Sequence, residues 1–317
     1  MTHLPTRKLR FGFADAEVPY LWNPSDPAFS SATNAMSFFF IAVEKMIVAA
    51  VNEALPLIAD PAVVDEARAF VRQEAQHTLA HRQHAKALIK THPPLKHVLD
   101  EMVKTYDGLT TRKPLKYRLA YVADLEATFT PSFKLMLDNA DTLFAPGDDR
   151  VASLFVWHFV EEVEHRSSAL LIYDSVVNSP WYRMRVAPSV FAHAGSVMVK
   201  AAEGFNRLVP TEIRKVDASS MFGGHRWKTV LAERFRFVSR LPGIGAPRFG
   251  PFGKPYPQVP LSQQVAAMIG VVRSQLPGHD PDQQKLPDMA AEWLARYGAG
   301  DDVTRWYTTA RNQLRTT

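Results

Sequence analysis

The chain has 317 residues, of which 46% are hydrophobic, so it can form one large domain with a sizeable core, and extensive disorder is not expected. It contains no cysteine, which excludes disulfides, zinc–thiolate sites and thiolate catalysis. The formal charge of +5 is only mildly basic, and no basic helix or RNA-binding motif is visible, so we predict no nucleic-acid partner.

Helical periodicity dominates residues 25–178, and strand signals are nearly absent there. Residues 1–24 look irregular because prolines interrupt them. A capping residue followed by proline, Asp26-Pro27, predicts the start of the first helix. The predicted helices of this region span about 25–55, 61–90, 94–107, 114–138 and 148–178. We therefore predict an all-α protein whose core is a four-helix bundle.

The rest of the chain is predicted to add helices to that bundle. Pro180 opens a further helix of about 30 residues, with a kink at Pro188. Residues 241–260 are too rich in glycine and proline for a regular helix. Short helices are expected at about 261–276, 287–297 and 302–315. The predicted organisation is an irregular segment at 1–24, a metal-binding bundle at 25–178, and additional helices packed on the bundle at 179–317.

Two short motifs predict a metal site. Both Glu74-Ala-Gln-His77 and Glu162-Val-Glu-His165 place a glutamate three residues before a histidine, and residues at that spacing share a helix face. A lone glutamate lies on an apolar helix stripe ahead of each motif, Glu44 before the first and Glu126 before the second. A buried carboxylate needs a counter-charge. Four glutamates and two histidines on four helices are the ligands of a carboxylate-bridged dinuclear metal site.

The last of these helices carries more candidates than its motif requires. His158, Glu161, Glu162 and His165 lie within an arc of roughly 100°. His158 is one turn before Glu162 and is either a third nitrogen ligand or a core histidine. Glu161 lies at the edge of the arc and either forms a salt bridge or binds the metal in a shifted mode.

Other polar and aromatic residues near the two motifs are predicted to surround the metal site rather than to bind the metal. His81 and His84 are expected on a polar flank of their helix, and the alternative for one of them is a partner of the metal ligands. Each ligand histidine should donate its second N–H to a carboxylate or carbonyl, for which Asp124 and Asp174 are candidates. Two tyrosines near the ligand helices are predicted to be core aromatics rather than redox-active groups: Tyr121 and Tyr173.

Oxygen and nitrogen ligands shared between two ions suit iron or manganese, so we predict two iron ions, or one manganese and one iron. The favoured function is an oxidoreductase, a monooxygenase that uses dioxygen and an external electron donor on a small organic substrate. The first alternative is a metal-dependent hydrolase. The second is a ferroxidase, or a metal-binding protein without an organic substrate. No catalytic residues are predicted beyond the metal ligands.

The motifs resemble those of the ferritin-like di-iron carboxylate superfamily over about residues 25–178. The segment from Trp157 to His165 is similar to a bacterial family described as predicted metal-dependent hydrolases. The spacing of His158, Glu162 and His165 also resembles that of arylamine N-oxygenases, which implies His158 as a seventh ligand in an oxygenase.

Partners and location follow from the remaining features. The helix after Pro180 is rather apolar and is expected to be a lid or a subunit contact, so we predict a homodimer. The basic stretch from Arg234 to Arg248 would favour a peripheral membrane contact. The N-terminus lacks a long apolar segment, and no window reaches about 18 uninterrupted apolar residues, so we expect no signal peptide, no membrane span and a cytoplasmic location.

Overall fold

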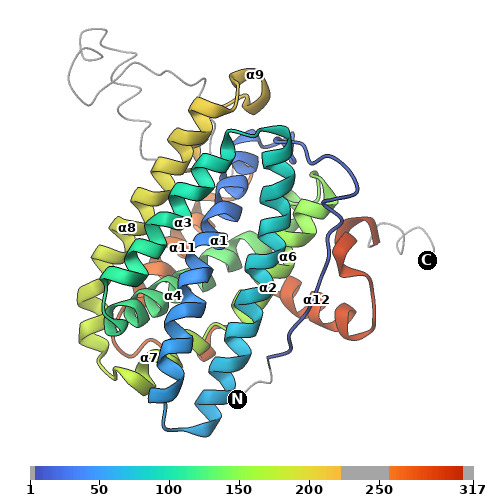
Figure 1. Cartoon of the computed structure of the whole chain (residues 1–317). Helices are drawn as coiled ribbons and strands as arrows, with labels where there is room; N and C mark the ends of the chain where they lie inside the picture. Colours follow the sequence, from blue (N-terminus) through green and yellow to red (C-terminus); the bar gives the residue numbers. More distant parts are fainter. Residues whose placement is uncertain (1–3, 223–256, 310–317) are drawn as a thin grey trace.

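The computed structural model describes residues 4–222 and 257–309, and in these residues the regular structure is helical throughout, without strands (Figure 1). The predicted all-α class and its bundle core are confirmed. Four long helices surround the core: α1 (Pro27–Ala54), α2 (Pro61–Thr91), α4 (Leu115–Asp138) and α6 (Asp149–Glu164).

Three of the four bundle helices begin with an aspartate N-cap. The side chains of Asp26, Asp60 and Asp148 each accept a hydrogen bond from a backbone N–H in the first turn of α1, α2 and α6. Such caps satisfy N–H groups that have no partner within the helix. In α1 and α2 a proline follows the cap and presets the helical backbone angle.

Helix α1 is the innermost element of the bundle. Most of its residues are buried, because α2, α3, α4 and α8 all pack against it. The stretch Pro27–Leu57 is long and apolar enough to cross a membrane, but 78% of its apolar window is buried inside the protein. A core helix passes the same test of length and composition, so this burial indicates a core helix.

The other helices cover the bundle. Helix α3 (Leu95–Arg112) and helix α8 (Pro180–Leu208) lie side by side against α1, and α8 also packs on α4 (Figure 1). Helix α11 (Leu261–Ser274) lies on α4, and α12 (Asp288–Gly298) contacts α6 and α4. Short helical turns complete the described chain: η1 (Leu55–Leu57), α5 (Ala140–Leu143), α9 (Thr211–Arg214), η2 (Ala218–Phe222), η4 (Pro281–Gln283) and η5 (Val303–Arg305).

Two predicted helices differ from those observed. The single helix expected at 148–178 is two helices, because the chain turns at residues 165–167 before α7 (Ser168–Val176). The hydroxyls of the two serines that follow donate to distant carboxylates, that of Ser167 to Asp282 and that of Ser168 to Glu66 on α2 at 2.6 Å. Helix α3 runs five residues beyond its predicted end, to Arg112. The expectation for residues 241–260 and the basic stretch from Arg234 to Arg248 lie almost wholly outside the described residues.

The N-terminal segment is irregular, as predicted, but it is well packed. It runs along the outside of α2 toward the bundle's far end, next to α12 (Figure 1). Phe11, Val18 and Trp22 are each buried in the core. This segment therefore forms one wall of the protein interior that holds the candidate site.

Candidate metal centre

The seven predicted metal ligands converge inside the bundle. Each is at most 3% exposed, although they come from four different helices and, for His165, from the residue that caps the end of α6. They form two groups, and within each group one ligand atom per residue lies within 4.8 Å of the others. The first group is Glu44, His77 and His158, and the second is Glu74, Glu126, Glu162 and His165.

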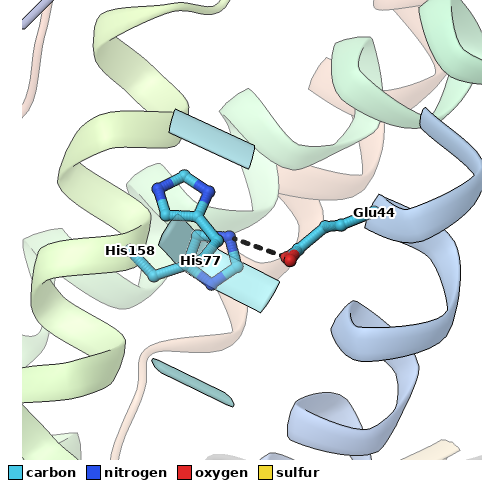
Figure 2. A group of neighbouring side chains, drawn as sticks. All are labelled: Glu44, His77 and His158. Atoms are coloured by element: carbon cyan, nitrogen blue, oxygen red, sulfur yellow. Dashed lines mark ion pairs between the residues drawn. The ribbon is translucent and has the colours of Figure 1, made fainter. Parts of the chain in front are cut away.

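Figure 2 shows the first group, where Glu44 reaches from α1 toward the two histidine rings. Its Oε1 lies 3.5 Å from Nε2 of His158 on α6. The imidazole rings of His77 and His158 have their centroids 4.1 Å apart. Two imidazole nitrogens and one carboxylate oxygen therefore face a common point.

Two glutamates connect the groups. Oε1 of Glu162 lies 2.9 Å from Nε2 of His158, and its Oε2 lies 3.3 Å from Nε2 of His165. Oε1 of Glu74 lies 3.7 Å from Nδ1 of His77 and 3.4 Å from Nε2 of His165. Glu74 and Glu162, the glutamates of the two motifs, thus lie between the two groups and would both contact metal bound in either one, while Glu44 and Glu126 lie at the ends.

Unpaired polar atoms show that this cluster fits a pair of metal ions. Buried polar atoms normally have a hydrogen-bond partner. In this cluster, however, the following buried atoms have none: Oε1 of Glu44, both oxygens of Glu74, Nδ1 of His77, Oε1 of Glu126, Oε2 of Glu162 and Nε2 of His165. They are the atoms that a metal would bind. When ionised, the four carboxylates carry four negative charges, which two divalent cations would balance.

The electrostatics of the cluster without metal lead to the same conclusion. Burial, together with a neighbouring carboxylate, raises the pKa of both Glu44 and Glu126 well above the usual carboxyl range. Burial also acts to raise the pKa of Glu162, but His165 and His158 hold that pKa well below its usual value. Too few positive charges lie near the carboxylates to stabilise all of them in the ionised form. Bound cations would supply the missing positive charge.

His77 is oriented by a buried ion pair. Its Nε2 lies 2.9 Å from Oε2 of Glu161, which is fully buried and accepts the ring proton. The other oxygen of Glu161 accepts from the guanidinium of Arg7 at 2.8 Å. Glu161 thus forms the salt bridge that was one of its two predicted roles. With its Nε2 proton donated to Glu161, His77 presents the lone pair of Nδ1 to the metal position.

The other two histidines are oriented by neutral partners. Nδ1 of His165 donates to the side-chain oxygen of Gln73 at 3.0 Å. Nδ1 of His158 shares a hydrogen bond of 2.7 Å with Nε2 of His81. In both rings this hydrogen bond leaves Nε2 directed into the cluster. Gln73 and His81 lie on α2 near the first motif. The sequence offered such a supporting role as the alternative for His81 and gave none to Gln73.

The prediction of a polar flank for His81 and His84 is wrong, since both side chains are fully buried. The hydroxyl of Ser37 on α1 bridges them, at 2.9 Å from Nδ1 of His81 and 2.7 Å from Nδ1 of His84. A hydrogen-bonded chain therefore runs from His158 through three further side chains. The ring of Phe13, which packs on His84 with centroids 5.2 Å apart, also lines a cavity of about 890 Å³ beside α2.

The proposed roles of Asp124 and Asp174 next to ligand histidines are also wrong. Asp124 is buried and pairs with Arg183 at 3.1 Å, and Asp174 is exposed. Both tyrosines are core residues, as predicted. The hydroxyl of Tyr121 hydrogen-bonds with Tyr106 and that of Tyr173 donates to a backbone carbonyl.

Aromatic side chains enclose the centre. The ring of Phe40 lies 4.4 Å from that of His158, measured between centroids, and the ring of Trp157 lies 5.0 Å from that of His77. Phe70 packs edge-on against His165 at 4.9 Å. These apolar walls exclude water, which strengthens every electrostatic interaction within the cluster.

Fold and site together define a helical-bundle protein with a buried carboxylate–histidine cluster suited to metal ions. The chain belongs to the family described as predicted metal-dependent hydrolases, whose model matches residues 5–251. The match covers the whole bundle and all seven candidate ligands. No curated protein and no solved structure matches the chain.

Proposed function

We propose that this protein holds two iron ions, or one manganese and one iron, and acts as a dioxygen-dependent oxidoreductase on a small organic substrate. The observation that carries the proposal is the set of seven buried ligands, six of which have facing atoms without a hydrogen-bond partner. Their oxygen and imidazole nitrogen atoms are the ligand types that suit iron and manganese.

The arrangement of the ligands supports the choice of chemistry. Glu74 and Glu162 stand between the two groups, as the bridging glutamates do in ferritin-like dinuclear carboxylate proteins. His158 gives the first group a second nitrogen, the feature that resembles arylamine N-oxygenases. An iron pair held in this way can supply electrons to dioxygen and so permit oxidation of an organic molecule, with an external donor restoring the reduced ions.

The side chains around the ligands have defined tasks in this function. Glu161 and Gln73 hold His77 and His165 so that one nitrogen of each faces the metal positions. Phe40 and Trp157 keep water away from the centre. Substrate oxidation requires such a dry site, because water would quench reactive species.

Metal-dependent hydrolysis is the second candidate, and the family description supports it more directly than it supports oxidation. A metal pair can generate hydroxide and polarise a carbonyl or phosphoryl oxygen. The ligand set argues for oxidation instead, since glutamates and histidines projecting inward from the helices of a four-helix bundle are the ligands of ferritin-like dinuclear carboxylate proteins.

The test compares the two chemistries on one preparation. The purified protein is loaded separately with iron, manganese and zinc, and its metal content and visible spectrum are measured. Dioxygen consumption is then followed after reduction of the iron form, and hydrolysis of nitrophenyl esters and phosphates is measured for all three forms.

We expect about two iron ions per chain, a charge-transfer absorption in the visible range, and dioxygen consumption by the reduced iron form alone. A zinc or manganese form that hydrolyses esters with no dioxygen uptake by the iron form would overturn the oxidoreductase proposal in favour of the hydrolase. Dioxygen consumption that only oxidises the bound iron, without any organic product, would indicate a ferroxidase.

A further inference from the structure

The two groups of ligands offer different donor atoms. They share Glu74 and Glu162, which lie between them. The remaining ligands define two metal positions: the first has Glu44, His77 and His158, and the second has Glu126 and His165. Both positions therefore have the same number of carboxylates, but the first has two imidazoles and the second has one.

A threonine fixes the carboxylate of the first position. The hydroxyl of Thr78 on α2 donates to Oε2 of Glu44 on α1 at 2.9 Å. Hydroxyls in helices often bond to the carbonyl one turn back in the same helix, whereas this one reaches across to a neighbouring helix. The hydrogen bond leaves Oε1 of Glu44, which has no such partner, facing the two histidines (Figure 2).

The carboxylate of the second position is held less firmly. Oε1 of Glu126 has no hydrogen-bond partner, and its Oε2 lies 3.5 Å from Nε2 of His165, which is itself a ligand. A side chain that is already held in place loses less conformational freedom when it binds. Glu44 is therefore better oriented for metal binding than Glu126.

The histidines of the two positions differ in the same direction. His77 donates to the carboxylate of Glu161, whereas His165 donates to the neutral amide oxygen of Gln73. A carboxylate partner raises the basicity of a ligand imidazole. His77 is consequently a stronger donor to metal than His165, and His158 adds a further nitrogen to the first position only.

The difference in nitrogen content also bears on which metal each position prefers. Sites with nitrogen and oxygen ligands generally bind ferrous iron more tightly than manganous ion. Imidazole suits iron, whereas carboxylates suit manganese. The position with two imidazoles should therefore discriminate against manganese more strongly than the position with one.

We propose that the two metal positions are inequivalent: the first binds its ion more tightly and selects iron, and the second is the one that admits manganese. Thr78 is a positioning residue of the first position, because it acts on the ion only through Glu44. The assignment rests on the proposed dinuclear centre and adds to it which metal each position holds.

The test locates each ion in addition to measuring how many bind. Two equal positions would also fill in two steps, because the first cation repels the second. Metal-free protein is therefore crystallised without oxygen after addition of one equivalent of ferrous iron, or of one equivalent each of ferrous iron and manganous ion. Anomalous scattering at the iron and manganese edges then gives the occupancy of each position.

Two substitutions at Thr78 separate its hydroxyl from its volume. Thr78→Val removes the hydroxyl with little change of shape, and Thr78→Ser keeps it. Thr110→Val is the matched control, because Thr110 is also half-buried and its hydroxyl bonds to the carbonyl of Tyr106 within α3. The affinity for the first iron is measured in each variant by competition with a coloured chelator.

We expect iron in the first position at one equivalent, and iron in the first with manganese in the second when both metals are added. Thr78→Val should lower the affinity for the first iron about 10–100-fold, the usual effect of losing a group that supports a ligand. Its single equivalent of iron should be spread over both positions, which a general loss of stability would not cause. Thr78→Ser and Thr110→Val should bind as wild type does.

The outcomes that contradict the inference differ from those that contradict the proposed function. Iron spread evenly over both positions of the wild type, or manganese in the first position, would overturn the inference and leave the dinuclear centre intact. Unchanged iron affinity in Thr78→Val would overturn the role of Thr78. A protein that binds no metal would overturn the proposed function, and the inference with it.

Discussion

Replacement of Arg7 by glutamine tests whether an ion pair from the N-terminal segment supports the metal centre. Arg7 is 4% exposed and contacts Glu161 at 2.8 Å and Glu164 at 2.7 and 2.9 Å. Its guanidinium also lies over the rings of Trp293 and Tyr297 of α12, 5.6 and 5.2 Å from their centroids. The substitution leaves the fully buried Glu161 without its cation.

Two effects of different size are expected. Removing one partner of a buried ion pair typically costs about 3–5 kcal/mol of unfolding free energy, because the other charge stays buried. Glu161 also orients His77, and loss of such a supporting partner typically lowers metal affinity about 10–100-fold. The unfolding free energy is measured by urea denaturation, and the metal affinity by competition with a coloured chelator.

The control is Arg10→Gln, in the same segment but at an exposed arginine. It should change the unfolding free energy by no more than about 0.5 kcal/mol. Equal stability and equal metal affinity in the two variants would refute the argument that Arg7 and Glu161 hold His77. A loss of stability with unchanged metal affinity would refute only the orienting role.

Three further predictions concern the centre and its surroundings. Glu126→Ala should lower the metal content well below two ions per chain with helicity retained, whereas Glu203→Ala at an exposed position should leave it unchanged; full occupancy in the first variant would remove Glu126 from the ligands. Ser37→Ala should cost about 1–3 kcal/mol of unfolding free energy, because His81 and His84 lose the hydroxyl between them, and a variant as stable as wild type would contradict this role. Removal of metal by a chelator should lower the melting temperature, since a site filled at a free metal concentration a hundredfold above its Kd contributes about 2.7 kcal/mol; a melting temperature indifferent to metal would argue against a site in the native bundle.

The sequence was sufficient for the seven candidate ligands because each carries a local signal. Glu74 and His77 share a helix face by their spacing, and a glutamate on an apolar stripe marks a buried carboxylate. The same spacing singled out Glu162 and His165, although His165 caps α6 rather than continuing it. His158 was left open between a ligand and a core histidine. Helix boundaries followed from capping residues and prolines for the same reason. Whether these residues bind metal stays a prediction, but their convergence is what a dinuclear site requires.

The missed residues depend on contacts that no single helix reveals. His81 and His84 look like polar flank positions on α2, and only the hydroxyl of Ser37 from α1 explains their burial. Gln73 likewise acquires its role from His165, 92 positions away. Such partners are set by how helices pack on one another, and periodicity within one helix carries no information about that packing.

The contacts of Arg7 also depend on how distant parts of the chain pack together, and they bear on how the chain divides into parts. It is 154 positions from Glu161, and its other face is covered by aromatic rings of α12 in the C-terminal third. The two ends of the described chain thus meet beside a ligand histidine. The predicted boundary at 178 stays a prediction about chain organisation, yet α12 lies two contacts from the centre, through Arg7 and Glu161. A truncation that removes α12 would therefore expose Arg7 to water and weaken the ion pair that orients His77, so the metal affinity of the bundle depends on helices outside it.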